Sequence, residues 1–344
     1  MRTLFIGGYG HHYLVPAALD GRLEAVGWAS DGVDAEASRR RCARRLGSAG
    51  GRGAAPFFDD CLQAFDQLEP EVVNIGGVHG RQGPIVAEAV RRGIKVVADK
   101  PIAANRGDLE AVERAVAEAS GRGEPAVVLT EYDLRSRPAF RAAREAVQRG
   151  MVGRPVLVTT QKSYRFGASR PAFYRDRADY GGTLLWIASH GVDLAWYAAG
   201  RPFAWVTGVQ GNLAKPEYGD FEDHVALCYA LADGGAAVVH ADFLRPASAP
   251  THGDDRLRLV GAEGQVEVRD GRCQFIANAD EPRDITDLGG AVNVTDELVE
   301  AIKGERSVYC TSCSMYMARV LLGSRDAADT GGRVELPDGP ADCR

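Results

Sequence analysis

The chain has 344 residues, of which 45% are hydrophobic and 26% charged, and its formal net charge is −6. This length predicts two domains, and the composition excludes a disordered or collagen-like chain. The negative balance argues against a nucleic-acid or acidic-membrane partner. The sequence contains no apolar stretch near the roughly 18 residues of a membrane span. Residues 4–6 are too short for a signal-peptide core, so we expect a cytoplasmic protein.

The first half of the chain alternates strands with helices. Residues 3–6 predict a buried strand, followed by the turn Gly7-Gly8-Tyr9-Gly10 and a helix from about residue 13. A strand, a glycine turn and a helix form the arrangement that directs free helix amides at a pyrophosphate. The glycine spacing matches the G-x-G-x-x-G pattern imperfectly, and an ordinary glycine turn is the alternative.

The second strand, residues 23–29, ends at Ser30 and Asp31. A carboxylate about 20 residues beyond the glycines would accept a ribose 2′-hydroxyl. Asp31 would repel a 2′-phosphate, so NAD is slightly favoured over NADP, although Arg39 or Arg40 could reach a phosphate. A helix or turn cap is the alternative for Asp31. The basic run of residues 39–45 is expected to be a solvated helix face.

Further elements continue the alternation up to residue 130. Gly83 and Pro84 are expected to open a helix with proline at its first position, and His79 before them is either a turn residue or part of a nicotinamide crevice. Repeated β-α-β units predict a doubly wound, dinucleotide-binding parallel sheet in a first domain, residues 1–130. After the second strand its elements are expected at residues 33–46, 72–75, 84–92, 94–97, 108–120 and 126–129.

The strand at residues 94–97 leads into Asp99, Lys100 and Pro101, where proline cannot donate an amide to the sheet. Ligands of an open parallel sheet lie beyond the carboxyl ends of its strands. Lys100 would therefore lie over the cofactor crevice, with Gly76 after the preceding strand. A lysine there can act as an acid or a hydrogen-bond donor, and a solvated loop lysine is the alternative.

The second half has a different pattern. A helix at residues 138–150 and a strand at 155–163 precede a loop, residues 164–180, that is rich in Arg, Tyr and Asp. Strands joined by glycine turns then predict a mostly antiparallel sheet in a second domain, residues 131–344. The later strands are expected at residues 205–210, 223–231, 235–243, 257–260, 265–269 and 273–277, and closing helices at 295–303 and 312–328.

Gly181 and Gly182 precede a helix predicted over residues 183–199. Trp186, His190 and Asp193 have the spacing of one helix face, which would place the imidazole between an aromatic ring and a carboxylate. A buried structural histidine is the alternative.

Seven cysteines are scattered along the chain. An odd number in a long chain favours reduced thiols over a disulfide framework. Cys310 and Cys313 have zinc-like spacing, but no second cysteine or histidine pair lies near them in sequence. We therefore expect thiols and no metal site, with redox or metal use of this pair as the alternative.

Lys100-Pro101 preceded by an acid, together with Gly181-Gly182 and His190, resembles the Gfo/Idh/MocA oxidoreductases, the superfamily of glucose-fructose oxidoreductase and inositol dehydrogenase. The resemblance extends over nearly the whole chain, to residues 327–331. It implies an α/β plus α+β fold, with an N-terminal Rossmann domain that binds NAD or NADP and a C-terminal open, mostly antiparallel sheet. It also implies hydride exchange with a hydroxyl or carbonyl of a sugar, cyclitol or related polyol. Lys100 would bind the reacting oxygen and pass a proton, with His190 as its acid/base partner.

Trp186 stands where many sugar and inositol dehydrogenases of this superfamily have an aspartate. Tryptophan cannot take a proton, but it could stack on a sugar or on the nicotinamide. Either Lys100 and His190 suffice, or Tyr164, Tyr174, Lys162 or Asp176 assists. The alternatives are a non-catalytic dinucleotide-binding sensor or co-regulator, and an imine or ene reductase of a non-sugar metabolite.

The small-molecule substrate is expected to contact polar and aromatic residues of the second domain. A homodimer or homotetramer is also expected, because the broad open face of an antiparallel sheet commonly packs on a second copy. The predicted substrate contacts are Tyr132, Lys162, Tyr164, Arg165, Arg170, Tyr174, Trp186, His190 and Asp193, with Arg245 and His252 as outliers.

Overall fold

The computed structural model describes residues 1–46, 55–167 and 170–340. Its N-terminal part is a six-stranded parallel sheet with strand order β3-β2-β1-β4-β5-β6. This order runs outward from β1 in both directions, so the predicted doubly wound fold is confirmed. The strands are β1 (Arg2–Ile6), β2 (Glu24–Ala29), β3 (Phe57–Phe58), β4 (Val72–Ile75), β5 (Lys95–Ala98) and β6 (Val128–Thr130).

Five helices accompany this sheet in the described residues. Every residue of β4 is buried, as expected for a central parallel strand covered by helices on both faces. The helices are α1 (Val15–Leu19), α2 (Ala35–Arg45), α3 (Cys61–Leu68), α4 (His79–Arg91) and α5 (Arg106–Gly121). The short pair β3 and α3 has no counterpart among the predicted elements.

Two predicted helix starts are wrong. Helix α1 begins at Val15 and spans only five residues. Helix α4 begins at His79, and Pro84 lies inside it rather than at its first position. Proline is tolerated there because it lies in the second turn, where only one backbone hydrogen bond, to the carbonyl of Gly80, is lost.

The C-terminal part contains a nine-stranded sheet with strand order β14-β13-β12-β11-β7-β10-β9-β8-β15. Only β7 and β10 run parallel among its described pairs, so the predicted mostly antiparallel sheet is confirmed. The strands are β7 (Pro155–Tyr164), β8 (Phe203–Gly211), β9 (His224–Leu231), β10 (Ala236–Asp242), β11 (Gly253–Gly261), β12 (Gly264–Arg269), β13 (Arg272–Ala277), β14 (Arg283–Asp284) and β15 (Val334–Glu335).

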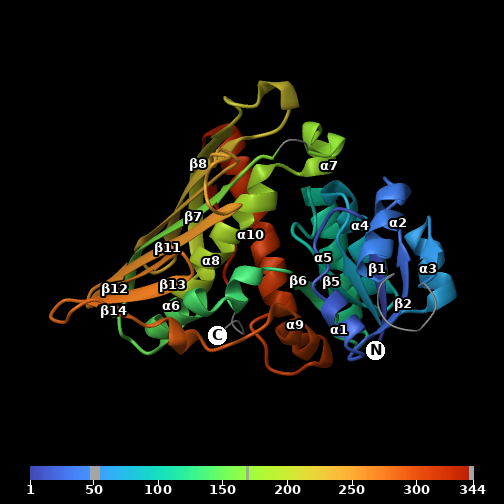
Figure 1. Ribbon diagram of the computed structural model, residues 1–344, viewed down its shortest axis with the longest axis horizontal. Helices are drawn as coiled ribbons and strands as arrows, with labels where there is room; N and C mark the ends of the chain where they lie inside the picture. Colours follow the sequence, from blue (N-terminus) through green and yellow to red (C-terminus); the bar gives the residue numbers. More distant parts are fainter. Residues whose placement is uncertain (47–54, 168–169, 341–344) are drawn as a thin grey trace.

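Helices pack on one face of this sheet. Figure 1 shows α8 and α10 between the large sheet and the N-terminal parallel sheet. The predicted helix over residues 183–199 is divided into a π-helical turn, η3 (Leu184–Ala188), and α8 (Ser189–Ala199). The other helices are α6 (Pro138–Gln148), α7 (Arg177–Tyr180), α9 (Val294–Lys303) and α10 (Thr311–Thr330), with short 3₁₀ turns η1 (Asp133–Ser136), η2 (Ala172–Arg175), η4 (Pro216–Tyr218) and η5 (Thr286–Gly289).

Helix α10 is joined to the outer strand of the parallel sheet by side-chain hydrogen bonds. The Thr311 hydroxyl accepts from the amide of Val128 at 3.1 Å. The Ser314 hydroxyl accepts from the amide of Thr130 at 3.0 Å. Two amides of β6 are thus bonded to α10.

Cys310 and Cys313 form a disulfide, so the expectation of reduced thiols is wrong for this pair. Cys310 caps α10 and Cys313 lies in its first turn, which brings their Cα atoms within 5.3 Å and allows the bond. Free thiols are found at Cys42, Cys61, Cys228 and Cys273, and Cys343 lies outside the described residues. No described helix is both long and apolar enough to cross a membrane.

Candidate active site

The Lys-Pro loop follows β5 and is buried. The Lys100 ammonium lies 3.0 Å from Asp99 Oδ1, and the side chains are 2% and 1% exposed. The peptide between Lys100 and Pro101 is cis. The Gln82 side-chain amide donates to the carbonyls of Asp99 and Pro101 at 3.1 and 2.7 Å. These bonds position the lysine at the carboxyl end of β5.

His11, which sequence reasoning did not single out, lies beside this pair. Its Nδ1 is 2.9 Å from Asp99 Oδ2 and 3.4 Å from Lys100 Nζ. Burial opposes ionisation of Asp99, but the charges of Lys100 and His11 hold its pKa below the ordinary value. The aspartate is therefore a buried anion shared by two proton-bearing groups. The only local signal for His11 was its position directly after the glycine turn.

Trp186 lies in the π-helical turn and is packed between the two domains. Its ring stacks on His79 at 4.1 Å between centroids and on His11 at 5.8 Å. The Lys100 ammonium lies 3.8 Å from the centre of the ring. The π-helical turn η3, of a kind frequent at functional sites, presents this ring to the lysine. The tryptophan therefore covers the lysine instead of supplying a carboxylate.

His190 is buried in α8. Burial lowers the pKa of its imidazole well below the ordinary value, and the charges of Lys162 and Lys100 lower it further. The imidazole is thus neutral at neutral pH. Its Nδ1 lies 3.6 Å from Asp133 Oδ1, and its ring is nearly perpendicular to the Tyr132 ring, with 6.2 Å between the centroids.

Asp133 is a second residue that sequence reasoning missed. Burial opposes its ionisation, but the charges of Arg137 and Lys162 hold its pKa below the ordinary value. Arg137 donates to Asp133 at 2.7 Å and to Asp255 at 3.2 Å. The available signal was the position of Asp133 just beyond β6, where a parallel strand ends.

Lys162 belongs to the same charged network. Its fully buried ammonium forms an ion pair with Asp255 Oδ1 at 2.8 Å and lies 4.7 Å from the centre of the Tyr164 ring. Burial opposes protonation, but Tyr164 and Asp255 raise the pKa of the lysine above its ordinary value. Lys162 is therefore a fixed cation whose charge acts on His190.

Asp193 does not contact His190 in the described structure. It forms a buried ion pair with Arg135, whose Nε lies 2.9 Å from Asp193 Oδ2. The Asp193 side chain is bonded to Arg135 of η1. The carboxylate beside the His190 imidazole is instead that of Asp133, the first residue of η1.

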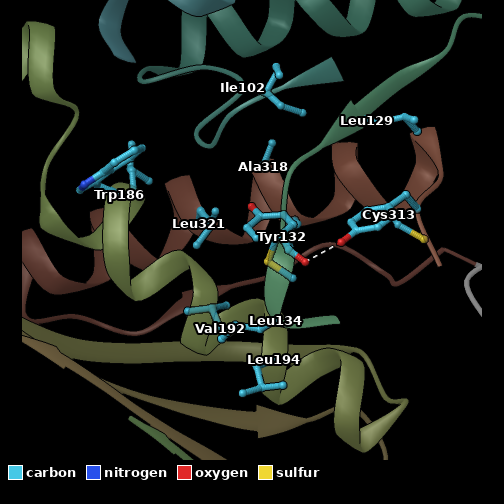
Figure 2. Close-up of a cluster of buried hydrophobic side chains, with 14 of the residues drawn as sticks. Ile102, Leu129, Tyr132, Leu134, Trp186, Val192, Leu194, Cys313, Ala318 and Leu321 are labelled. Carbon is cyan, nitrogen blue, oxygen red and sulfur yellow. Dashed lines mark hydrogen bonds between the residues drawn. The ribbon is translucent and has the colours of Figure 1, made fainter. Parts of the chain in front are cut away.

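The remaining predicted substrate residues form other contacts within the described structure. Tyr174 stacks on Tyr180 at 4.3 Å, and Arg170 lies 5.3 Å from the Tyr174 ring. Tyr132 belongs to the buried cluster of Figure 2, with Leu134 and residues of α10. Tyr164 packs on His252, Arg165 pairs with Leu244 in a β-bridge, and Arg245 binds Asp254. Asp176 caps α7.

The glycine turn is packed closely against the ends of β4 and β5. Gly7 has φ +94°, and a Cβ on Gly10 would lie 2.6 Å from Gly76 Cα and 2.7 Å from Asp99 Oδ2. The amides of Gly10 and His11 donate to Gly76 and Asp99. These two amides are therefore directed into the protein, unlike the free helix amides predicted from the sequence.

Arg41 is the residue of the basic run 39–45 that does not fit a solvated face. Its guanidinium donates to the carbonyls of Tyr9 and Gly10, and its buried Nε has no hydrogen-bond partner among the described residues. Arg39 and Arg40 pair with surface acids. A cation beneath the glycine turn suits a pyrophosphate.

Asp31 and Ser30 lie at the end of β2. The Asp31 carboxylate accepts from the amide of Val78, the N-cap of α4, and burial raises its pKa. The Ser30 hydroxyl accepts from the amide of Gly32. Asp31 therefore links the end of β2 to the segment after β4, and its amide bonds do not test the predicted contact with a ribose.

Glu131 is a further buried acid that the sequence did not indicate. Burial and the charge of Asp99 raise its pKa well above the ordinary value. Its Oε1 accepts from the Asn74 side chain at 2.8 Å and from the amide of Tyr13 at 3.2 Å. Burial and the neighbouring Asp99 therefore both favour the protonated form of Glu131.

His79 predicts a measurable pH dependence of stability. Burial lowers its pKa to about 4, whereas an unfolded histidine titrates near 6.5. Below pH 6.5 the unfolded chain binds a proton that the folded chain refuses, so stability falls by about 1.4 kcal/mol per pH unit. Between pH 7.5 and 5.5, the wild type should lose about 1.4 kcal/mol more free energy of unfolding than His79→Phe. Urea unfolding without cofactor measures this difference, and equal losses would contradict the buried neutral state.

Comparisons with known proteins agree with this architecture. Residues 140–267 match the family model of the GFO/IDH/MocA C-terminal domain. The fold is shared with a Thermotoga maritima protein provisionally assigned as an oxidoreductase, with 29% sequence identity, a TM-score of 0.90, and coverage of 98% of this chain and 100% of that chain. No curated protein matches the sequence significantly.

Two more distant structures share the fold at 18% sequence identity. One is levoglucosan dehydrogenase in complex with NADH, with a TM-score of 0.78 and coverage of 98% of this chain and 99% of that chain. The other is aldose-aldose oxidoreductase from Caulobacter crescentus complexed with glycerol, with a TM-score of 0.75 and the same coverage. Residues 140–267 match the C-terminal domain of the Gfo/Idh/MocA family, and the whole chain shares its two-domain fold with the Thermotoga maritima protein.

Proposed function

We propose that this protein is an NAD(P)-dependent oxidoreductase acting on a hydroxyl or carbonyl group of a sugar, cyclitol or related polyol. The observation that carries the proposal is the combination of a buried ammonium, Lys100, with a neutral imidazole, His190, whose pKa responds to the lysine charge. The NADH complex of a dehydrogenase with the same fold supports a nicotinamide cofactor.

The residues around the glycine turn fit such a cofactor. Arg41 supplies a cation with an unpartnered buried nitrogen, and Gly7, Gly10 and Gly76 allow the close backbone packing of a dinucleotide fold. We propose that the predicted cofactor residues hold the dinucleotide along this edge, namely Gly7, Gly8, Tyr9, Gly10, Ser30, Asp31, Gly76, His79, Asp99, Lys100 and Pro101. The carboxylate of Asp31 favours NAD over NADP.

When bound, the nicotinamide supplies hydride acceptance or donation. Lys100 would donate a hydrogen bond to the reacting oxygen, stabilising the negative charge that develops there when a hydroxyl is oxidised. His190 is neutral and can accept the hydroxyl proton, and Asp133 would stabilise the resulting imidazolium. In the reverse direction, reduction of a carbonyl, the protonated His190 would return the proton to the reacting oxygen.

His11 and Asp99 would support Lys100 in this role. The ammonium of Lys100 donates to Asp99 and lies 3.4 Å from Nδ1 of His11, which is half exposed, so the His11 tautomer with an unprotonated Nδ1 would accept a proton from the lysine. This route compensates for Trp186, which cannot take a proton. Trp186 would instead form an apolar surface for the substrate or the nicotinamide.

The decisive experiment follows the nicotinamide absorbance while the protein meets NAD or NADP and a panel of aldoses, inositols, sugar acids and keto-sugars. We expect turnover with at least one polyol and a higher kcat/KM with NAD. Tight cofactor binding without turnover would favour a sensor or co-regulator. Turnover restricted to imines or activated alkenes would favour a reductase of a non-sugar metabolite.

We also propose a domain division at residues 130 and 131, and a homo-oligomer assembled through the open face of the second sheet. Leu157, Val209 and Val238 are exposed on that face, whereas Val158 and Val239 are buried on the other. A two-fold contact would bury the apolar residues of both copies.

The oligomer can be tested by light scattering after size-exclusion chromatography. The wild type should have a mass of two or four times 36.8 kDa. Val238→Glu should shift this mass toward that of the monomer, because a charge would be buried at the contact. Val33→Glu, on an exposed position of the first domain, is the control. A monomeric wild type would contradict the proposal.

A further inference from the structure

A cavity lies at the C-terminal end of α8, where the helix ends at Gly200. Its volume is about 460 Å³, and it is lined by residues of η1, α6, α8, α9 and the start of α10. Lys100, His190 and Trp186 do not belong to its lining. Its chemistry is therefore independent of the proposed oxidoreductase site.

Arginine side chains give this cavity a positive character. Four line it, of which Arg135 is neutralised by Asp193 and Arg141 by Glu297. Arg144 donates to the carbonyl of Tyr197, and Arg306 is exposed. Neither of these two forms an ion pair within residues 1–46, 55–167 and 170–340.

The lining acids do not compensate for these two charges. Glu297 is shared with Arg141, and Glu145 pairs with Arg149 at 2.6 Å. Since guanidinium groups stay protonated, two positive charges remain for a ligand. The cavity therefore favours a small organic anion with carboxylate or phosphate groups.

The Cys310–Cys313 disulfide forms part of the cavity wall. Cys310, the N-cap of α10, is half-buried, whereas Cys313 is 3% exposed and belongs to the hydrophobic cluster of Figure 2. The amide of Cys313 donates to Cys310 Sγ at 3.2 Å. An incoming thiol would therefore reach Cys310, and the positive end of α10 would stabilise the thiolates produced in its first turn.

We propose that Cys310 and Cys313 form a thiol–disulfide exchange site for a small thiol that carries carboxylate or phosphate groups. The external thiolate attacks Sγ of Cys310, the bond to Cys313 breaks, and Cys313 leaves as a thiolate that takes a proton. A second external thiolate then attacks the external sulfur of the mixed disulfide. Cys310 leaves as a thiolate, and the two external thiols are released joined in a disulfide. Two electrons pass in total from two external thiols to the protein disulfide. In the reverse reaction, the disulfide of the external thiol oxidises Cys310 and Cys313.

The first test compares an anionic and a neutral thiol in a Cys343→Ser background, which removes the cysteine nearest the chain end. Reduced glutathione and 2-mercaptoethanol are mixed with the oxidised protein, and the rate of reduction is measured by alkylation and mass spectrometry. The ratio of the two rates should fall by about threefold or more in Arg306→Gln, because one steering charge is lost. Arg114→Gln, an exposed arginine of α5 outside the cavity, should leave the ratio unchanged.

The second test identifies the attacked sulfur. With oxidised glutathione, Cys313→Ser should form a mixed disulfide at Cys310, whereas Cys310→Ser should leave the buried Cys313 unmodified. Modification of Cys313 alone would overturn the proposed order of steps. Two free thiols at every ratio of reduced to oxidised glutathione would overturn the exchange site, and an unchanged rate ratio in Arg306→Gln would overturn anion recognition by the cavity.

Discussion

Lys100→Ala should lower kcat about 100- to 10,000-fold on the substrate that the panel identifies, whereas the affinity for NADH should fall much less, because Lys100 is one of several residues proposed to hold the dinucleotide. The ammonium is held by Asp99 and covered by Trp186, so no described neighbour can replace it at the same position. Because the lost interaction is made with the reacting oxygen, kcat and kcat/KM should fall together. Steady-state kinetics and NADH titration measure the two effects.

The matched control is Lys303→Ala, which removes an exposed lysine at the end of α9. It should leave kcat unchanged. Circular dichroism must show that Lys100→Ala is folded, because the variant leaves the buried Asp99 with His11 as its remaining side-chain partner among the described residues. A folded Lys100→Ala enzyme with near-normal turnover would remove the lysine from the proposed chemistry.

Asp193→Ala should reduce the free energy of unfolding by about 3–5 kcal/mol. The substitution leaves the buried guanidinium of Arg135 without its counter-charge, and both side chains are at most 3% exposed. Urea unfolding at neutral pH measures the loss. Asp296→Ala is the control, since its surface pair with Arg22 should contribute less than about 1 kcal/mol.

A double variant separates structure from substrate binding at this position. Arg135→Met with Asp193→Leu removes both charges and should recover most of the lost stability, because a buried pair can be replaced by apolar groups of similar volume. If Asp193→Ala were as stable as the wild type and raised KM instead, Asp193 would contact substrate, as its place on α8 first indicated.

The parts of the fold that the sequence predicted correctly depend on local patterns. The apolar residues of β4 and β5, and Pro101 after Lys100, determine where these strands lie and end. Glycine turns between amphipathic strands likewise indicated the antiparallel sheet. The onset of α4 was misjudged because its start depends on a distant partner, the Asp31 carboxylate that accepts from Val78.

The candidate site was only partly predictable for the same reason. Lys100 and His190 belong to recognisable local motifs, but Asp133 reaches His190 from another element, and no spacing in sequence reveals that contact. Arg41 looked like one charge in a solvated run, yet it lies under the glycine turn. Pairings between distant segments therefore account for most of what sequence reasoning missed.

The hydrogen bonds that the amides of β6 donate to the hydroxyls of Thr311 and Ser314 have a consequence for association between molecules. An outer strand with free amides is a template onto which a strand of another chain can add, which leads to aggregation. Here the hydroxyl groups of α10 occupy two of those amides, and Thr311 also donates to the carbonyl of Ala126. The second domain thus protects the edge of the first from intermolecular strand pairing.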